Sequence, residues 1–190
     1  MKKQKFTVHD MVVVGLMAAI VYAATTIRVE IPTPMGKTMI HMATVACLIS
    51  GLLFGPLRGG LAGGIGSFFF DIFNGWASSA PFTLVFKFFI GFLAGMITGG
   101  KRCGTLRTLA ASAAGSYAYA VLYLSKDFIR DLLLGAAMET AFADVSVKAV
   151  TSLANGTLAV VVATLLAPVL RTALERAGLG EVGSRHKTAD

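Results

Sequence analysis

Several stretches of this sequence carry no charged residue and are long enough to cross a lipid bilayer. Residues 11–27 and 149–170 contain no Asp, Glu, Lys or Arg. A membrane-spanning helix needs about 20 mostly apolar residues. Further apolar stretches run through 38–57, 59–73, 81–98 and 106–124. The sequence therefore predicts an all-α integral membrane protein with six transmembrane helices.

The composition agrees with a protein that lies almost entirely in the membrane. Only 14% of its 190 residues are charged, against about 25% in soluble domains. No polar stretch is long enough for a second soluble domain. We expect one membrane domain over residues 1–175 and a polar, disordered tail over 176–190. The two isolated cysteines predict neither a disulfide framework nor a metal site.

The net charge of +7 has a topological explanation, because the basic residues gather between the apolar stretches. We do not expect nucleic-acid binding. With the N-terminus inside the cell, the inner side holds 11 of the 17 basic residues and the outer side holds four, and two lie in or beside spans. Loops on the cytoplasmic side are richer in Lys and Arg. Both termini are therefore predicted to be cytoplasmic. A cleaved signal peptide at the N-terminus is the alternative, which the basic residues from Arg171 onward oppose.

Polar residues within the last four spans recur at helical spacing. They are Ser67, Asp71 and Asn74; Thr83 and Lys87; Ser112, Ser116, Tyr119 and Tyr123; and Asp144, Lys148, Thr151 and Asn155. Polar residues in membrane helices face protein or a water-filled cavity. The stripes meet in the outer half of the membrane, which predicts a pocket open to the outside. The alternative is a set of polar contacts without a ligand, such as an ion pair of Asp144 with Lys148.

Lys87 lies within a span and needs a partner, either a carboxylate such as Asp71 or a ligand oxygen. Trp76 precedes the same span, as an interfacial anchor or as a lid that stacks on a flat ring. No paired metal ligands and no ATP-binding motif are visible in the sequence. We therefore expect neither an enzyme nor a cofactor.

Small residues form a separate stripe in the first span, at Gly15, Ala19 and Ala23. Small residues four apart allow another helix to approach closely. This stripe packs either inside the bundle or against a separate membrane subunit. Glycines at 59, 60, 63 and 64 predict close helix packing in the third span as well.

Three segments resemble a known family: 51–67 (GLLFGPLRGGLAGGIGS) with the following Asp71, 80–87 (APFTLVFK) and 91–95 (GFLAG). They closely resemble the substrate-binding S components of energy-coupling factor (ECF) vitamin transporters, in the branch with riboflavin, pyridoxine and hydroxymethylpyrimidine carriers. The resemblance is specific over about 45–100. The fifth and sixth spans match only in general character.

The resemblance implies a six-helix protein of the bacterial cytoplasmic membrane that holds a vitamin or vitamin precursor in its outer half. It implies that the first-span stripe docks onto a transmembrane coupling subunit carrying two ATPases, that Lys87 faces the pocket, and that the loop over about 28–38 acts as a gate. The candidate ligand-binding residues, of which those in the sixth span rest on spacing alone, are Lys87, Asp71, Asn74, Trp76, Thr83, Phe86, Tyr119, Tyr123, Lys148, Thr151 and Asn155. The alternatives are a solitary facilitator and a structural six-helix protein of the cell-shape type.

Overall fold

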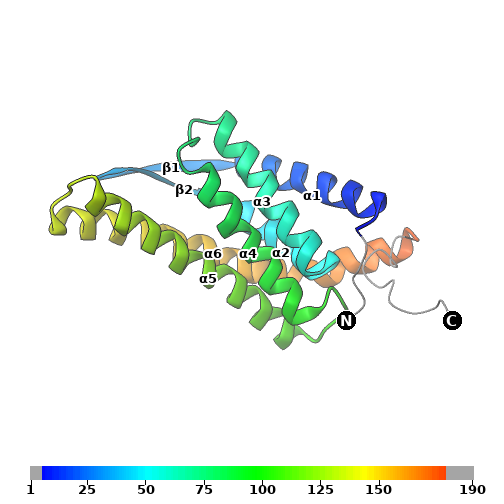
Figure 1. Ribbon diagram of the computed structural model, residues 1–190. Helices are drawn as coiled ribbons and strands as arrows, with labels where there is room; N and C mark the ends of the chain where they lie inside the picture. The colour runs from blue at the N-terminus through cyan, green and yellow to red at the C-terminus, as the bar shows by residue number, and fades with distance from the viewer. Residues whose placement is uncertain (1–5, 179–190) are drawn as a thin grey trace.

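The computed structural model describes residues 6–178, which form six α-helices and one β-hairpin (Figure 1). The hairpin consists of β1 (Arg28–Thr33) and β2 (Gly36–His41) and lies between the first two helices. The helices are α1 (Val8–Thr26), α2 (Ala43–Phe54), α3 (Pro56–Phe73), α4 (Ala80–Thr98), α5 (Thr105–Leu133) and α6 (Met138–Arg176). The expectation of an all-helical class is thus confirmed apart from the hairpin. Most of the expected polar tail, from residue 179 on, lies outside the described residues.

Three of the described helices are long and apolar enough to cross a membrane: α1, α4 and α6. Helix α2 is apolar but has only 12 residues. Helix α6 has 39 residues, which corresponds to about 58 Å at about 1.5 Å per residue. That length exceeds a bilayer core of about 30 Å. Six spans and the cytoplasmic location of both termini stay predictions.

The β-hairpin replaces the start of the second predicted span. Its strands pair antiparallel from Arg28 opposite His41 to Thr33 opposite Gly36. The prediction of a helix from residue 38 was wrong, because residues 38–41 belong to β2 and α2 begins at Ala43. The two-residue turn after Thr33 folds this segment back along β1, where its backbone groups find partners that a helix would otherwise supply.

Charged side chains hold the exposed side of the hairpin. Glu30 on β1 accepts from Arg28 at 3.0 Å and from Lys37 on β2 at 2.9 Å. Hydrogen bonding to Lys37, and then to Arg28, lowers the pKa of the Glu30 carboxyl. The hairpin tip therefore carries its own paired charges, separate from those of the helices.

Helices α2, α3 and α4 touch through their backbones. A methyl group on Gly51 of α2 would overlap the backbone of Gly91 on α4, and one on Gly91 would overlap Gly59 on α3. A Cβ on Gly64 would lie 2.6 Å from the carbonyl oxygen of Leu84. Glycine is needed at these positions because nothing larger than hydrogen fits between the helices. The close packing predicted from the glycines of the third span is confirmed.

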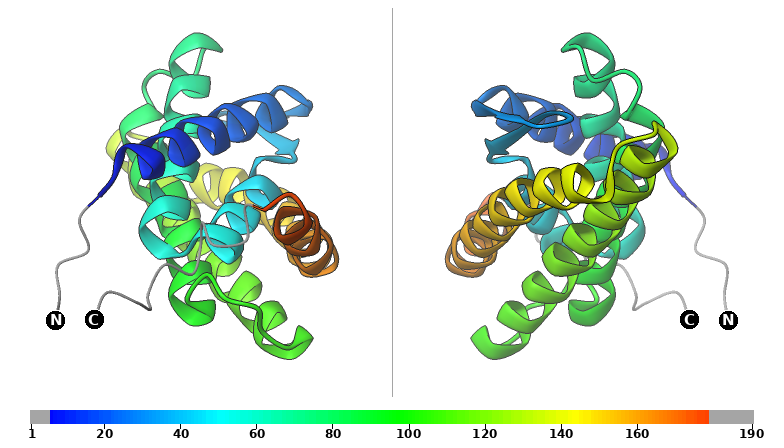
Figure 2. Two further views of the ribbon diagram at one scale, coloured as in Figure 1. Left: turned by 90° about the vertical axis from the view of Figure 1, so that its right-hand side faces the viewer. Right: turned by 90° about the vertical axis from the view of Figure 1, so that its left-hand side faces the viewer.

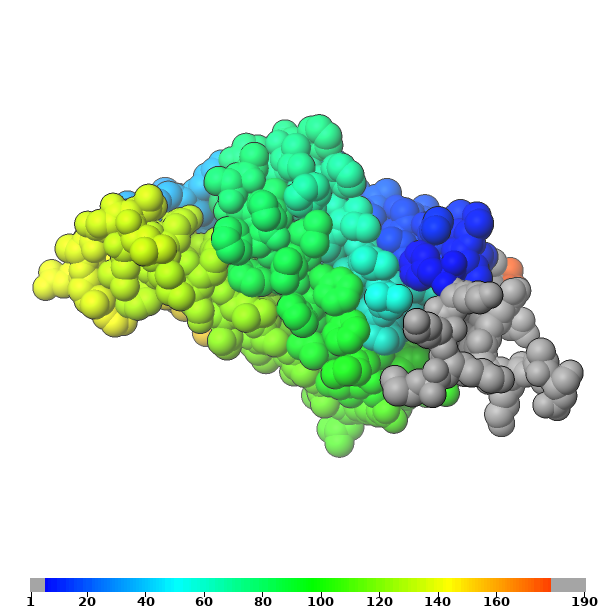
Figure 3. Space-filling model, in the orientation of Figure 1, coloured from blue at the N-terminus to red at the C-terminus, as the bar shows by residue number. Residues whose placement is uncertain are grey.

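The remaining helices attach to this block in different ways. Helix α1 packs against α3, and α5 and α6 pack against each other (Figure 2). Arg58 at the start of α3 forms an ion pair of 2.8 Å with Asp10, the residue whose side chain also completes the capping box with Thr7 at the start of α1. The turn between α5 and α6 projects at the end of the molecule opposite the start of α1 (Figure 3).

Candidate functional site

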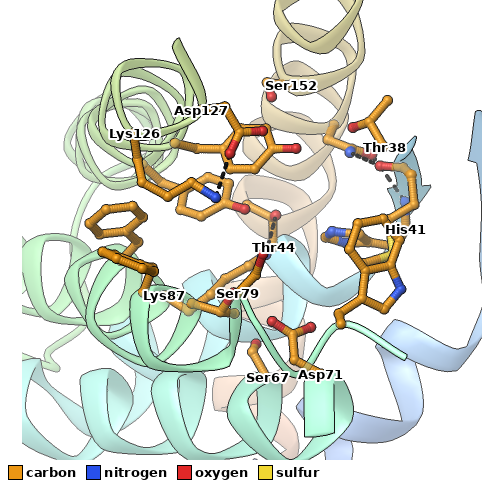
Figure 4. Close-up of a pocket in the computed structure, with 18 of the residues that line it drawn as sticks. Thr38, His41, Thr44, Ser67, Asp71, Ser79, Lys87, Lys126, Asp127 and Ser152 are labelled. Carbon is orange, nitrogen blue, oxygen red and sulfur yellow. Dashed lines mark hydrogen bonds and ion pairs between the residues drawn. The ribbon is translucent and has the colours of Figure 1, made fainter. Parts of the chain in front are cut away.

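A cavity of about 250 Å³ lies beneath the hairpin, between the last turn of α3, the first half of α4 and the facing parts of α5 and α6 (Figure 4). Cavities that bury drug-sized ligands usually measure about 300–1,000 Å³, so this one suits a compact molecule. Figure 4 shows Ser67 and Asp71 on one side of the space and Asp127 and Ser152 on the opposite side.

Lys87 brings a buried positive charge to the wall of this cavity. The residue is 3% exposed, and its Nζ atom donates a hydrogen bond of 3.3 Å to Thr44 Oγ1. The same nitrogen lies 4.6 Å from the centroid of the Tyr119 ring. An ammonium group has three donors, and among the described residues Lys87 forms no ion pair with a carboxylate. Lys87 therefore has donor capacity left for a ligand.

Asp71 contributes a carboxylate from a different wall. It lies on α3, is 4% exposed and lines the same cavity as Lys87. The pairing of Lys87 with Asp71, one of the two partners considered for this lysine, is absent within residues 6–178 at the 4.0 Å limit of an ion pair. The cavity thus offers a donor and an acceptor that are not used up by each other.

Aromatic rings form a second kind of wall. Tyr119 and Tyr123 stack with their centroids 5.9 Å apart, one turn apart on α5. Phe82 and Phe86 lie 6.2 Å apart on α4. Trp76, in the turn before α4, also lines the cavity, and the Lys37 ammonium lies 4.7 Å from the centroid of its ring. These faces suit a flat ring, because aromatic systems stack with offset geometry.

Buried polar atoms of lining residues include Ser116 Oγ and Trp76 Nε1, which have no hydrogen-bond partner within the described part of the chain. Leaving such a group unsatisfied costs about 1–3 kcal/mol. A bound molecule with matching donors and acceptors would remove that cost. This observation distinguishes the cavity from a packing defect lined by apolar side chains.

A chain of buried charges supports the side of the cavity formed by α5 and α6. Lys148 on α6 bridges Asp127 at 2.7 Å and Asp144 at 2.6 Å. Lys126, which lines the cavity, also pairs with Asp127. The ion pair of Asp144 with Lys148, which was considered as part of the alternative without a ligand, is therefore present. Because both its carboxylate partners come from the protein, Lys148 serves the wall and not the cavity itself.

Helix α6 also holds the hairpin over the cavity. Three of its polar side chains bond to β2 or to the turn. The contacts are Met35 N to Asp144 Oδ1 at 2.8 Å, Thr38 to Thr151 through their hydroxyls at 3.2 Å, His41 N to Asn155 Oδ1 at 3.1 Å, and Asn155 Nδ2 to Met39 O at 2.9 Å. Most polar side chains in the stripe of the sixth predicted span are therefore engaged in hydrogen bonds with the hairpin.

The structure brings most of the predicted site residues to one place. Those that line the cavity are Asp71, Trp76, Thr83, Phe86, Lys87, Tyr119, Tyr123 and Asn155. Asn74, Lys148 and Thr151 do not line it. Asn74 follows the last residue of α3 and donates to the carbonyl oxygen of Phe70 at 3.1 Å. The other two are engaged in the contacts with Asp127, Asp144 and Thr38 described above.

Sequence reasoning missed several lining residues. Thr38, His41 and Thr44 come from the hairpin and the start of α2, where no stripe of polar residues at helical spacing is predicted. Lys126 and Asp127 lie three and four residues after Tyr123 on α5. Continuing the spacing of Ser116, Tyr119 and Tyr123 beyond the predicted end at residue 124 would have found both.

The small-residue stripe of α1 faces away from the bundle. Gly15, Ala19 and Ala23 are all exposed, and a Cβ added to Gly15 would meet nothing within 4 Å. The alternative that this stripe packs inside the bundle is therefore excluded for the single chain. The neighbouring Val14, Met17 and Ala18 carry the contacts of α1 with the core.

The fold and the cavity define a helical membrane protein with a polar site suited to a small molecule. The family model for the ECF-type riboflavin transporter S component matches residues 5–173, so the chain belongs to this family. It is also 40% identical over 76 residues to a protein of Pyrococcus woesei described as "uncharacterized protein in gap 3′ region". That match covers 40% of this chain and about half (51%) of the length of the relative.

Proposed function

We propose that this protein is the substrate-binding subunit of an ECF-type importer that captures a small water-soluble vitamin or vitamin precursor. The observation that carries the proposal is the cavity in which Lys87 and Asp71 offer a donor and an acceptor that do not pair with each other, among aromatic faces. The family is one of transporter components and not of enzymes. Riboflavin, which the family's description names, is the first ligand to test.

In this proposal, six helices cross the bacterial cytoplasmic membrane and both termini lie in the cytoplasm. The distribution of Lys and Arg supports this orientation. It places the hairpin and the cavity toward the outside, where a scarce nutrient is captured. The hairpin covers the cavity, so its movement against α6 admits the ligand.

The ligand contacts that we propose involve the lining residues of the predicted set, with Lys87 donating to a ligand oxygen and Asp71 accepting from a ligand N–H or O–H. Tyr119, Tyr123 and Phe86 flank its ring. Lys148 and Thr151 do not contact the ligand in this proposal. They position the cavity wall and the hairpin, respectively. Asn74 acts from the end of α3, beside Trp76.

We further propose that the exposed stripe of Gly15, Ala19 and Ala23 docks onto a transmembrane coupling subunit that carries two ATPases. Its exposure supports this role, since small residues let a partner helix approach closely. Ala19→Trp is expected to abolish transport and to leave ligand binding unchanged. The matched control is Ile20→Trp, which adds a ring of the same size at the next position of α1, where the side chain is already 45% exposed. Loss of binding in Ala19→Trp would count against the docking role.

Mass spectrometry of the small molecule that copurifies with the detergent-solubilised protein tests the central proposal. We expect one vitamin-like compound in the wild-type protein and none in Lys87→Ala. Titration with riboflavin, pyridoxine and hydroxymethylpyrimidine then ranks the ligands. A folded protein that binds none of a wider panel of vitamins and precursors would favour the structural alternative. Uptake in a host without coupling subunits would favour the solitary facilitator.

A further inference from the structure

A second, smaller cavity lies at the other end of α4. It measures about 60 Å³ and lies between the last turn of α4, the start of α5 and the last third of α6. Thr98, which lines it, follows Lys87 by eleven residues, or about 16 Å along a helix. The two cavities therefore have separate walls, and the smaller one does not depend on the function proposed for the larger one.

Positive charge surrounds this second cavity. Lys101, Arg102 and Arg171 line it, and its lining includes no carboxylate. The guanidinium of Arg171 is fixed by hydrogen bonds of 3.0 Å to the carbonyl oxygen of Gly100 and 2.6 Å to that of Leu52. The nearest negative partner that the structure gives Arg102 is Glu175 at 3.9 Å, and both side chains are largely exposed, so this pair is weak. The charge of these basic side chains is thus not neutralised by a carboxylate of the lining, which favours the binding of an anion.

The start of α5 adds a second source of positive potential. This helix has 29 residues, and its first helical residue, Thr105, lines the cavity. The preceding Gly104 has no side chain to cap the first amides, and no side-chain cap is formed. Free amides and the helix dipole favour an anion at such an end.

An unpartnered hydroxyl group points independently to a ligand here. Thr164 on α6 lines the cavity and is 8% exposed, and its Oγ1 atom has no hydrogen-bond partner among the described residues. Buried side-chain hydroxyls nearly always have a partner. A hydroxyl can donate to an anionic oxygen, and this one lines the same cavity as Lys101, Arg102 and Arg171.

The size of the cavity and its surroundings narrow the class of anion. At about 10–15 Å³ per water molecule, 60 Å³ holds about four to six oxygen-sized groups, which is enough for the four oxygens of one tetrahedral phosphate. Apolar side chains of α6 next to the cavity are exposed, among them Leu165 at 66% and Val169 at 62%. Such a surface suits acyl chains, and basic pockets between membrane helices bind phosphate headgroups.

We propose that this second cavity binds a phosphate group, with an anionic phospholipid as its source. The phosphate oxygens accept hydrogen bonds from Arg102, Lys101, the first amides of α5 and the Thr164 hydroxyl. The acyl chains lie along the exposed leucine and valine side chains of α6. A free phosphate ion would use the same polar groups without the apolar ones.

Native mass spectrometry of the delipidated full chain, titrated with phosphatidylglycerol, tests this site. Diacylglycerol with the same acyl chains is the phosphate-free control. Arg102→Gln and Thr164→Val are expected to lower phosphatidylglycerol binding at least fivefold and at least twofold, respectively. The matched control is Arg176→Gln, which removes one charge from an exposed side chain near the end of α6 that does not line the cavity, and it is expected to leave binding unchanged.

A parallel titration with inorganic phosphate separates the two sources. Phosphatidylglycerol binding that depends on Arg102 and Thr164 supports the site with a lipid as its ligand. Binding of inorganic phosphate alone, with the same dependence, supports the site with a soluble phosphate as its ligand. Equal binding of phosphatidylglycerol by all three variants and the wild type, or equal binding of diacylglycerol, overturns the proposal. Thermal unfolding of each variant confirms that the compared proteins are folded.

Discussion

The carboxylate of Asp144 on α6 accepts a hydrogen bond of 2.8 Å from the backbone amide of Met35 at the tip of the β-hairpin. The same side chain pairs with Lys148 at 2.6 Å, and Lys148 in turn reaches Asp127 beside the cavity. A single carboxylate thus connects the cover of the cavity to its wall. Movement of the hairpin away from α6 has to break this contact.

Replacing Asp144 with Ala is expected to loosen the hairpin. Removing one partner of a buried ion pair costs about 3–5 kcal/mol, although Lys148 keeps Asp127 as a second partner. Hydrogen–deuterium exchange should accelerate across residues 33–40, and ligand dissociation should become faster. Thr151→Val is the milder comparison, because the only contact with the hairpin that its hydroxyl makes is the one with Thr38, worth about 1 kcal/mol or about a fivefold change. Its other hydrogen bonds are to carbonyl oxygens within α6. Unchanged exchange in Asp144→Ala would show that other contacts hold the hairpin.

Lys87→Met is expected to separate ligand binding from stability. Methionine fills a similar volume without the charge, and it removes the cost of burying an ammonium group that has no carboxylate partner. The ligand should lose about 2–5 kcal/mol of binding free energy, as when one member of a buried charged contact is removed. Calorimetric titration and thermal unfolding of the same samples measure both effects. Lys37→Met, in the exposed part of the lining, is the control. Lower stability with intact affinity would mean that Lys87 has a purely structural role.

Two glycine substitutions should differ sharply in their effect on stability. Gly91→Ala places a methyl group against the backbone of Gly59, and overpacking of this kind typically costs about 1–3 kcal/mol or more. Gly15→Ala meets open space and gains up to about 1 kcal/mol from helix propensity. Thermal unfolding in detergent should show a lower midpoint for the first variant and an equal or higher one for the second. Equal midpoints would mean that α3 and α4 can move apart without cost.

The two native cysteines test the proposed orientation. Cys103 lies between α4 and α5 and is half-buried, whereas Cys47 in α2 is fully buried. In intact cells, a maleimide that does not cross membranes should leave the protein unlabelled. After permeabilisation it should label Cys103, and Cys103→Ser should abolish the signal. Labelling before permeabilisation would place this loop outside the cell and reverse the proposed topology.

Much of the candidate site was visible in the sequence because its walls are helices. Lys87, Asp71, Tyr119 and Tyr123 were found through helical spacing, and the structure places all four around one cavity. A polar residue in a membrane helix faces protein or a water-filled cavity, so its position in the sequence indicates which face of the helix is buried. Asn74 follows Asp71 at helical spacing in the sequence, but α3 ends at Phe73. The spacing therefore no longer fixed the direction of its side chain.

The hairpin was not predictable from the same signals. After Lys37, the second strand runs into α2 without a charged residue, so periodicity predicts one helix for both. Thr38 and His41 lie in the cavity wall because β1 and β2 pair along their length. That pairing depends on contacts with Asp144, Thr151 and Asn155, more than 100 residues later in the chain. A local pattern contains no information about partners at that distance.

The backbone contacts among Gly51, Gly59 and Gly91 divide the molecule into a stiff part and a deformable part. Where two helices touch without side chains between them, no rotamer can change to absorb a displacement. Helices α2, α3 and α4 must then shift as one rigid body, carrying Lys87 and Asp71 with them at a constant separation. The contacts that can adjust are those that polar side chains make between α6 and the hairpin. In the opening that we propose, the cavity therefore changes shape on one side only, and its donor and acceptor keep their spacing.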